Sequence, residues 1–168
     1  MSLLLYALSA VSLAQADSVS TNFAEAAGWD IQRRPDGCFM MSAYGATESA
    51  EGETTFAYFV SPDESQMLIF HNSRWQLAEE TGRDFTLLFE GTEGNWQQLV
   101  GQARPDEEEG STISLSFDSS ALRSLSEDIG SARGVRLLRG DRQIEGLSLT
   151  GAPEALRLLT QCVATLRR

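Results

Sequence analysis

Apolar and polar residues alternate with a period of two in two runs of the chain, and other runs rich in aromatic or branched residues lie between turn sequences. Phe85, Leu87 and Phe89 follow this pattern, and at 113–117 apolar residues alternate strictly with serines. Such alternation is typical of a strand with one buried face. The pattern predicts seven to nine short strands, drawn from residues 29–32, 38–44, 54–60, 66–72, 85–89, 96–100, 113–117, 135–138 and 143–149.

Three turn sequences join neighbouring strands of this set. They are RPDG at 34–37, SPDE at 61–64 and RGDR at 139–142. Proline presets φ for a turn, and glycine or aspartate tolerates the remaining turn conformations. Each turn therefore predicts a hairpin, and hairpins make the sheet mainly antiparallel.

The period becomes helical after residue 118. Leu122, Leu125 and Ile129 share one face of a short helix that Asp118 or Ser119 caps and Gly130 ends. Pro153 suits the first turn of a second helix, whose apolar stripe consists of Ala155, Leu159, Cys162, Val163 and Leu166. Residues 17–27 are predicted to be a tail or a frayed helix. The predicted fold class is α+β, a mainly antiparallel sheet with one short helix and a C-terminal helix packed on it.

The N-terminal residues predict export. An apolar run at 3–13 precedes Ala14-Gln15-Ala16, whose small residues fit cleavage after Ala16. A short membrane anchor and a buried N-terminal helix are the alternatives. No later run approaches the roughly 20 apolar residues of a spanning helix. We therefore expect a cleaved signal peptide at 1–16, a single extracytoplasmic domain at 17–168, no membrane span after cleavage, and a periplasmic or secreted protein.

Export bears on the two cysteines. Cys38 and Cys162 are the only cysteines of the chain, and an oxidising compartment favours a disulfide between them. A redox-active pair is the alternative, but such pairs are typically spaced Cys-x-x-Cys. A structural bond would close a loop of about 125 residues, which stabilises the fold by roughly 5 kcal/mol in the chain-entropy description.

Charge excludes one class of partner. The formal net charge is −11, and all 13 basic residues are arginine. Nucleic-acid binding requires basic residues to replace phosphate counterions, so no nucleic acid is expected as a partner. The acidic runs at 48–53 and 106–109 are interpreted as solvated loops, with a calcium site as the alternative for the second. The basic residues Arg133, Arg136, Arg139 and Arg142 indicate a solvent-facing hairpin or a basic stripe.

Catalytic motifs are few. His71 is the single histidine, which excludes a multi-histidine metal site, and neither a metal nor another cofactor is predicted. The chain contains no Gly-x-Ser-x-Gly and no phosphate-binding glycine motif. Paired carboxylates could hydrolyse a glycan. The candidates near aromatic residues are Glu79, Glu80, Glu90 and Glu93, for which solvated turns are the alternative.

Scattered positions resemble a known group of proteins. They are Trp29 before Cys38, the segment Asn72-Ser73-Arg74-Trp75, and the pattern Ala155, Leu159, Cys162. This Trp…Cys…Asn-x-x-Trp…Ala-x-x-x-Leu-x-x-Cys pattern is similar to that of small exported bacterial proteins of unassigned function. The resemblance implies the same fold and disulfide, and it transfers no active site.

The sequence favours a non-catalytic binding or accessory protein of the bacterial envelope. Its candidate interaction surface comprises His71, Asn72, Trp75 and Trp96. One alternative is an envelope glycan or peptide hydrolase that uses His71 or paired acids. Another is a carrier of a small apolar ligand, whose cavity would be lined by Phe56, Phe59, Phe70, Phe85 and Phe89. The expected partner is an envelope protein or a small ligand, and the chain is a monomer or an edge-strand dimer.

Overall fold

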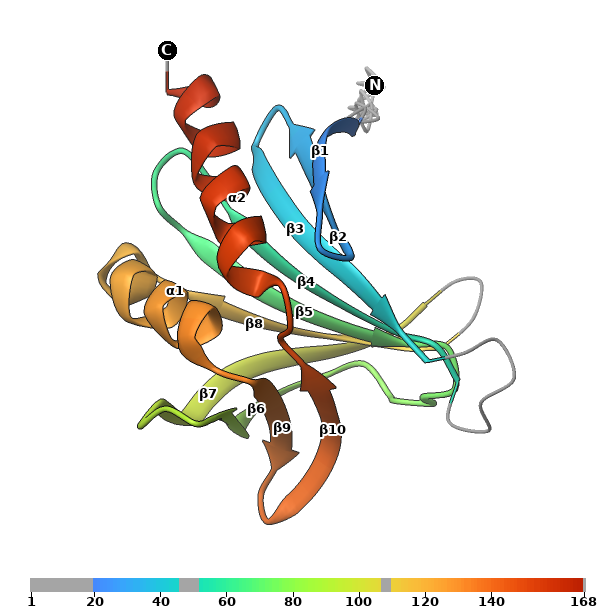
Figure 1. Cartoon of the computed structure of the whole chain (residues 1–168). Coiled ribbons are helices and arrows are strands. Elements are labelled where there is room, and N and C mark those ends of the chain that lie inside the picture. Colours follow the sequence, from blue (N-terminus) through green and yellow to red (C-terminus); the bar gives the residue numbers. More distant parts are fainter. Residues whose placement is uncertain (1–19, 46–51, 107–109, 168) are drawn as a thin grey trace, which may run out of the picture.

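A computed structural model describes residues 20–45, 52–106 and 110–167 (Figure 1). The predicted signal peptide, Glu48, Glu51 and residues 107–109 lie outside these ranges. The loop at 106–109, to which the calcium alternative referred, is therefore described only at Asp106.

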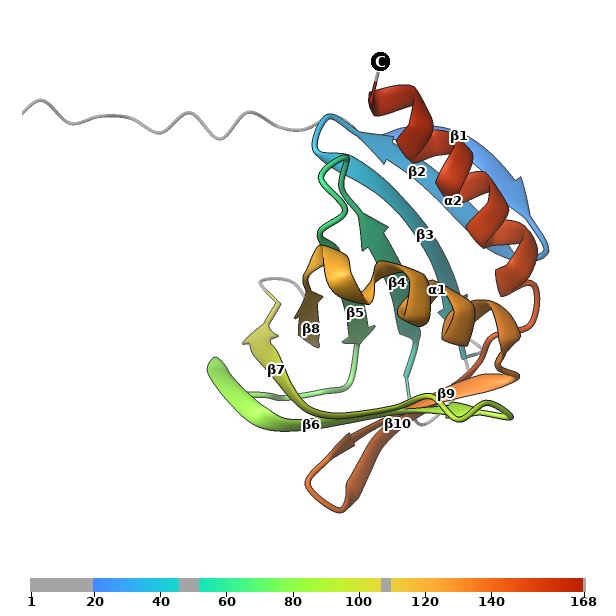
Figure 2. The ribbon, with the colours of Figure 1, turned by 90° about the vertical axis from the view of Figure 1, so that its left-hand side faces the viewer.

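Within these ranges ten strands form one antiparallel sheet in the order β1-β2-β3-β4-β5-β8-β7-β6-β9-β10. The strands are β1 (Thr21–Ala26), β2 (Trp29–Arg34), β3 (Gly37–Tyr44), β4 (Thr54–Val60), β5 (Gln66–Asn72), β6 (Glu80–Glu90), β7 (Asn95–Pro105), β8 (Ser111–Phe117), β9 (Gly134–Arg139) and β10 (Arg142–Ser148). Two helices cover its concave face (Figures 1 and 2). The α+β prediction is confirmed.

The alternating pattern sets most strand positions. In β5 every second residue is buried, beginning with Gln66, so these residues share the buried face of the sheet. Strands β4 and β5 occupy the predicted residues because the apolar pattern and the intervening turn agree there. Strands β6 and β7 are each 11 residues long. They extend into polar sequence, where they pair with each other along the backbone and Glu80 and Asp84 pair with Arg139.

Strand β1 corrects the expectation of a tail or frayed helix. Residues 21–26 pair antiparallel with β2 at the edge of the sheet. Three of its six residues, including Phe23, lie exposed in succession at its start. No buried face is present to impose a period of two, so the strand leaves little trace in the apolar pattern.

The helices lie where the sequence predicts them. A single 3-10 turn, η1 (Ser119–Ala121), leads into α1 (Leu122–Ser131), and the Asp118 carboxylate accepts a hydrogen bond from the Ser120 backbone N–H at 2.9 Å. α2 (Ala152–Leu166) follows Gly151, whose φ of 83° suits glycine. The predicted stripe packs inward, because Ala155, Leu159, Cys162 and Val163 are buried.

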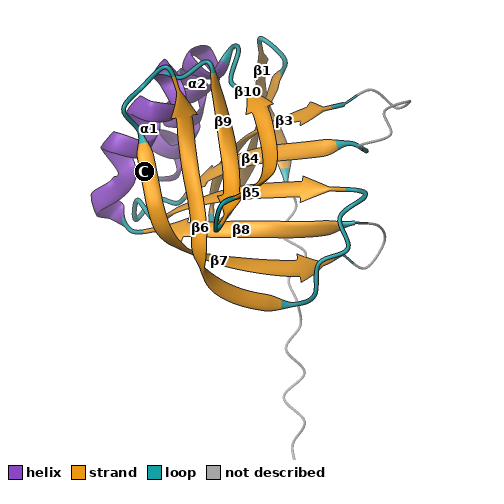
Figure 3. Ribbon diagram, turned by 90° about the horizontal axis from the view of Figure 1, so that it is seen from below, coloured by secondary structure: helices purple, strands orange, loops and turns teal. Residues whose placement is uncertain are grey.

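The sheet is strongly curved, and the β9–β10 hairpin bends back toward the first half of the sheet (Figures 2 and 3). Three hydrogen bonds link the C-terminal half to β2, β3 and β4. Trp29 Nε1 donates to the Thr150 carbonyl at 2.9 Å, and the Tyr44 hydroxyl donates to the Ser148 carbonyl at 2.6 Å. The third joins Thr54 to Glu145 at 2.8 Å. The last strand thereby comes close to β4, from which five strands separate it in the sheet order.

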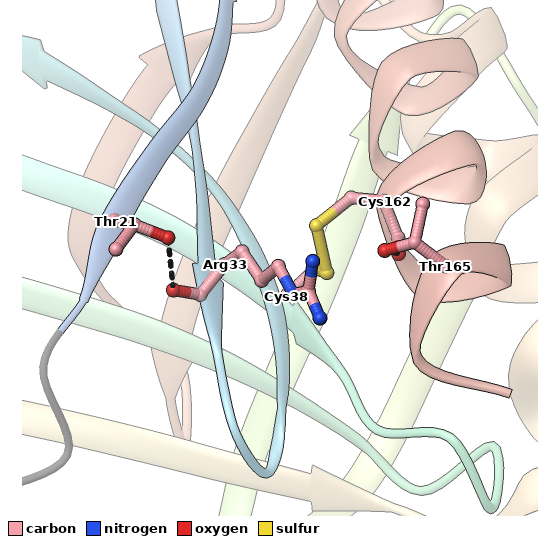
Figure 4. The surroundings of a disulfide bond; sticks show 5 residues. All are labelled: Thr21, Arg33, Cys38, Cys162 and Thr165. Carbon is pink, nitrogen blue, oxygen red and sulfur yellow. Dashed lines mark hydrogen bonds between the residues drawn. A yellow bond between two sulfur atoms is a disulfide. The ribbon is translucent and has the colours of Figure 1, made fainter. Parts of the chain in front are cut away.

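The predicted disulfide is confirmed. Cys38 of β3 and Cys162 of α2 are bonded, 124 residues apart in sequence, and both are fully buried (Figure 4). The bond ties the C-terminal helix to the third strand. α2 also contacts β1, β2 and α1.

Neither helix found in the described ranges has the length and hydropathy that a membrane crossing requires. The longer of the two, α2, has 15 residues.

Candidate functional site

A row of buried polar residues crosses the sheet near the end of β5. Thr54, Asn72 and Ser111 are direct neighbours on β4, β5 and β8, and they are 5%, 3% and 0% exposed. We call them the polar row. Asn72 Nδ2 donates to Thr54 Oγ1 at 2.7 Å, and the Thr54 hydroxyl donates to Glu145 Oε2 on β10 at 2.8 Å. Buried polar groups need such partners, so the row fixes the distance between β4 and β10.

The polar row also fixes the segment that follows β5. Asn72 accepts two backbone hydrogen bonds, from the Arg74 N–H on its side-chain Oδ1 at 2.8 Å and from the Trp75 N–H on its carbonyl at 3.2 Å. The Ser111 hydroxyl donates to the Trp75 carbonyl at 3.0 Å and accepts from the Leu77 N–H at 2.9 Å. Residues 74–77 are thus held in place although they belong to no strand.

Beneath this segment lies a pocket of about 620 Å³, which we call the Trp75 pocket. Its floor is apolar core, because Phe85, Ala103 and Ile113 are at most 1% exposed. The Phe85 ring lies over Gly101, where a β-carbon would come within 2.4 Å of it. The walls and rim are Arg74, Trp75, Gln76, Leu77, Asp84, Arg139, Arg142 and Ile144. This volume lies in the range of small-molecule sites.

One of the three arginines at the pocket is neutralised. Arg139 forms ion pairs with Glu80 and, at 3.1 Å, with Asp84, and its guanidinium lies 5.5 Å from the centre of the Phe85 ring. The hydrogen bond from Arg139 lowers the pKa of the Glu80 carboxyl below its usual value. The same hydrogen bond raises the pKa of Arg139. Arg139 is therefore a fixed, charge-compensated part of the wall.

Arg74 and Arg142 are different. Both are exposed residues that line the pocket, one from the segment after β5 and one from the start of β10. Among the described residues neither has a carboxylate within ion-pair distance. In a chain of net charge −11, two uncompensated arginines at one pocket form a local positive site.

The four residues of the predicted interaction surface do not form one surface. Asn72 belongs to the polar row and is buried, while Trp75 lines the pocket. His71, the neighbour of Asn72, points to the opposite face of the sheet. There His71 Nε2 lies 3.2 Å from Asp106 Oδ2, and Thr112 donates to the same oxygen at 3.1 Å. His71 lies on neither the Trp75 pocket nor the groove between the helices.

Trp96 lies at the other end of the sheet. Its indole Nε1 donates to Asp128 Oδ2 of α1 at 2.8 Å, and its ring meets Phe117 edge to face at 5.6 Å. Phe117 pairs with Gln66, at the start of β5, whereas Asn72 ends that strand. Trp96 therefore attaches α1 to the sheet and does not contribute to the Trp75 pocket.

A second hollow separates the helices. α1 and α2 approach where Gly130 faces Leu156, and they diverge toward the other ends. The opening, about 390 Å³, is the helix groove, lined by Tyr58, Val60, Glu64, Leu122, Arg123, Ser126, Glu127, Leu156, Leu159, Thr160, Val163, Ala164 and Arg167. At its base the Tyr58 hydroxyl donates to Gln66 Oε1 at 2.5 Å and lies 3.1 Å from Ser126 Oγ. Burial raises the pKa of Tyr58 to about 12.

The five phenylalanines of the predicted carrier cavity do not line one cavity. Phe56, Phe70 and Phe89 are buried in the core, and the first two pack ring against ring at 5.1 Å. Phe59 is on the outer face, 4.8 Å from Phe39. Of the five, Phe85 lines the Trp75 pocket.

Three of the four candidate acids are engaged by arginine. Glu79 pairs with Arg104 at 3.8 Å and Glu90 with Arg136 at 3.3 Å, and Glu80 pairs with Arg139. Glu93 lies in the turn between β6 and β7. A general acid in glycoside hydrolysis needs a raised pKa, whereas the Arg139 hydrogen bond lowers that of Glu80. The described ranges hold no group of three or more histidine, cysteine, aspartate or glutamate residues placed to bind a metal ion.

Sequence reasoning missed most of the pocket. Arg139 and Arg142 were attributed to a solvent-facing hairpin, and Ile144 was one position in its strand. Their proximity to Trp75 depends on the bend of the β9–β10 hairpin across the sheet. The signal that was present is the segment Asn72-Ser73-Arg74-Trp75, whose side chains provide both the anchor and one wall.

In comparisons with known families, curated proteins and solved structures, nothing matches this chain. Its candidate functions are therefore inferred from its own residues.

Proposed function

We propose that this chain is an exported, non-catalytic binding protein of the bacterial envelope, and that its ligand occupies the Trp75 pocket. The observation that carries the proposal is a pocket of about 620 Å³ with an apolar floor, an indole wall and a positively charged rim. The wall is held in place by hydrogen bonds to the polar row. A rigid, preformed site loses little entropy on binding, which favours affinity.

Export is supported by two independent features. The N-terminal residues have the length and small-residue spacing of a cleaved leader, and Cys38 and Cys162 form a disulfide. Disulfides persist mainly in oxidising compartments such as the periplasm and the exterior.

Binding is favoured over hydrolysis because the acidic residues near the pocket form ion pairs with arginine. Glu80 and Asp84, which lie nearest the pocket arginines, are both bonded to Arg139. The Arg139 hydrogen bond lowers the pKa of the Glu80 carboxyl, and a carboxylate that stays charged at neutral pH donates a proton poorly. The acids of this region therefore serve to orient Arg139.

The test of export is the intact mass of the protein purified without reductant from a periplasmic extract. We expect the mass of residues 17–168, and an increase of two hydrogens after denaturation and reduction. A full-length, reduced chain would contradict the proposal of export.

The test of binding uses N-phenyl-1-naphthylamine, a neutral apolar dye that fluoresces when it leaves water. Ile144→Trp places a large ring in the half-buried wall of the pocket and should abolish saturable dye binding. Val100→Trp is the matched control, because Val100 is 45% exposed and lies outside the pocket. Equal dye affinity in the wild type and both variants would overturn the assignment of the site.

A further inference from the structure

The Trp75 pocket combines two kinds of surface that favour different parts of one ligand. Its apolar surface comes from the half-buried Trp75, Leu77 and Ile144, above a floor that is at most 1% exposed. Arg74 and Arg142, 68 residues apart in sequence, line the same pocket. We propose that the pocket binds an amphipathic anion, with its charged group at Arg74 and Arg142 and its apolar part against Trp75, Leu77 and Ile144. This inference rests on the proposed function and names the ligand class of that site.

The charge distribution selects an anion. Seven arginines form ion pairs with carboxylates: Arg34, Arg104, Arg123, Arg136, Arg139, Arg157 and Arg167. Five other arginines of the described ranges form no such pair: Arg33, Arg74, Arg83, Arg133 and Arg142. Of these five, Arg74 and Arg142 line the Trp75 pocket. Guanidinium groups bind carboxylate, sulfonate and phosphate oxygens through charge-assisted hydrogen bonds. An anion at this rim would supply the partner that the protein itself does not.

The surrounding charges limit the size of the anion. Glu79, Glu80 and Asp84 lie close to the pocket in sequence and space, and the whole chain carries −11. A polyanion or an anionic bilayer would be repelled by this field, whereas a single charged group inside the opening meets Arg74 and Arg142 at short range. The ligand is therefore one soluble molecule with a small anionic group.

The walls orient the apolar part. Arg139 is fixed over the Phe85 ring by Glu80 and Asp84 and closes one side. Trp75 and Leu77 close another, and the polar row holds their backbone. Aromatic and aliphatic walls of this kind accept a ring or a short chain, and they contribute affinity in proportion to the area removed from water.

The experiment compares two dyes that share one apolar body. 1-Anilinonaphthalene-8-sulfonate carries a sulfonate, and N-phenyl-1-naphthylamine has the same naphthyl and phenyl rings without it. We expect Arg74→Gln/Arg142→Gln to weaken binding of the sulfonate at least about tenfold, because two charge-assisted hydrogen bonds are lost. Binding of the neutral dye should stay within about twofold of the wild type, as these bonds do not involve it.

A charge-matched variant controls for the change in net charge. Arg33→Gln/Arg133→Gln also removes two arginines without a carboxylate partner among the described residues, and neither lines the Trp75 pocket. This variant should bind both dyes like the wild type. Added sodium chloride should weaken binding of the sulfonate dye and leave binding of the neutral dye unchanged, because salt screens exposed charges.

Each outcome separates the inference from the proposed function. If Ile144→Trp abolishes binding of both dyes but the arginine variants bind the sulfonate normally, the pocket is a binding site and the anion inference is wrong. If Ile144→Trp changes neither dye, the site itself is wrong. Sedimentation with phosphatidylglycerol vesicles should leave the protein in solution, and co-sedimentation that depends on Arg74 and Arg142 would overturn a free amphiphile as the ligand.

Discussion

The Trp75 pocket and the helix groove are two hollows in one small domain, and they differ in how their charges are used. At the groove, Glu64 pairs with Arg167 at 3.0 Å and Arg123 with Glu127 at 3.9 Å. The Tyr58 hydroxyl at its base has its own partners. At the pocket, Arg74 and Arg142 have no such carboxylates within the described part of the chain. A hollow whose polar groups are already satisfied gains little from a polar ligand.

The helix groove has a structural role, whereas the Trp75 pocket is the proposed binding site. The groove is the space left where α1 and α2 diverge, and its polar groups hold the helices on the sheet. The pocket depends on the polar row and on the β9–β10 hairpin, and none of its lining residues belongs to α2. Substitutions at the groove should therefore lower the free energy of unfolding without changing ligand binding at the Trp75 pocket. Substitutions of residues that line the pocket should change ligand binding and leave the free energy of unfolding nearly unaltered.

The largest expected effect comes from the bond that holds α2. Cys38→Ala/Cys162→Ala should lower the free energy of unfolding by about 2–5 kcal/mol, because the unfolded chain loses a long loop constraint. Urea unfolding measures the change. Dye affinity at the Trp75 pocket should be unaltered in the folded variant, and a parallel loss of affinity would show that the pocket depends on α2.

The next effect concerns the base of the groove. Tyr58→Phe leaves Gln66 Oε1 without its donor, so the free energy of unfolding should fall by about 1–3 kcal/mol at neutral pH. Ser126→Ala is the milder control, because Ser126 is only half-buried. Thermal unfolding measures both variants. A Tyr58→Phe variant as stable as the wild type would show that the groove base is not a stabilising network.

The same residue gives a dependence on pH. Burial raises the pKa of Tyr58 from 10.0 to about 12. Between these values the folded state keeps the proton that the unfolded state loses, so stability falls as pH rises from 10 to 12. The loss should reach roughly 2 kcal/mol in the wild type and be smaller in Tyr58→Phe, where Tyr44, whose pKa burial also raises, remains. Urea unfolding across this range measures the difference, and identical curves would contradict the assignment.

A smaller effect is expected at the pocket rim. Glu80→Gln removes one of the two carboxylates that neutralise Arg139. The pocket then becomes more positive, and binding of 1-anilinonaphthalene-8-sulfonate should tighten by about two- to fivefold. Fluorescence titration measures this, with Glu90→Gln as a control that pairs with Arg136 away from the pocket. Weaker binding in Glu80→Gln would mean that the orientation of Arg139 matters more than its charge.

The smallest effect is expected at the groove rim. Glu127→Gln breaks an exposed pair with Arg123 one helical turn away. Such pairs contribute little, so the midpoint of thermal unfolding should change by less than about 2 °C. Sulfonate binding should not change at all. A clear loss of dye binding in this variant would place the ligand in the groove and reverse the comparison.

Local sequence patterns were sufficient for most of the fold. The limits of β4 and β5 follow from alternating burial between turn residues, and Asp118 marks the start of the first helix through its own hydrogen bonds. The disulfide follows because the chain offers only Cys38 and Cys162. In contrast, the sequence does not predict β1. This exposed edge strand is held by backbone pairing, which leaves no periodic pattern in its side chains.

The candidate site was predictable only in part. Asn72 and Trp75 were identified from one short segment, yet Trp96 was grouped with them and lies at the other end of the sheet. Arg139 and Arg142 were noticed as basic residues of a hairpin, and their use could not be assigned. Glu145, which bonds to Thr54, carried no local signal.

The sequence by itself determined most of the elements other than β1, their antiparallel hairpins, the disulfide and the acidity of the chain, because these depend on neighbours in sequence or on a choice of two cysteines. The tertiary structure alone decided that β10 returns toward β4 and that Arg74 and Arg142 line one pocket with Trp75. The curvature of a ten-stranded sheet results from the small twists between neighbouring strands and from the packing of the two helices. No local sequence pattern predicts this overall curvature, and the pocket forms only because of it.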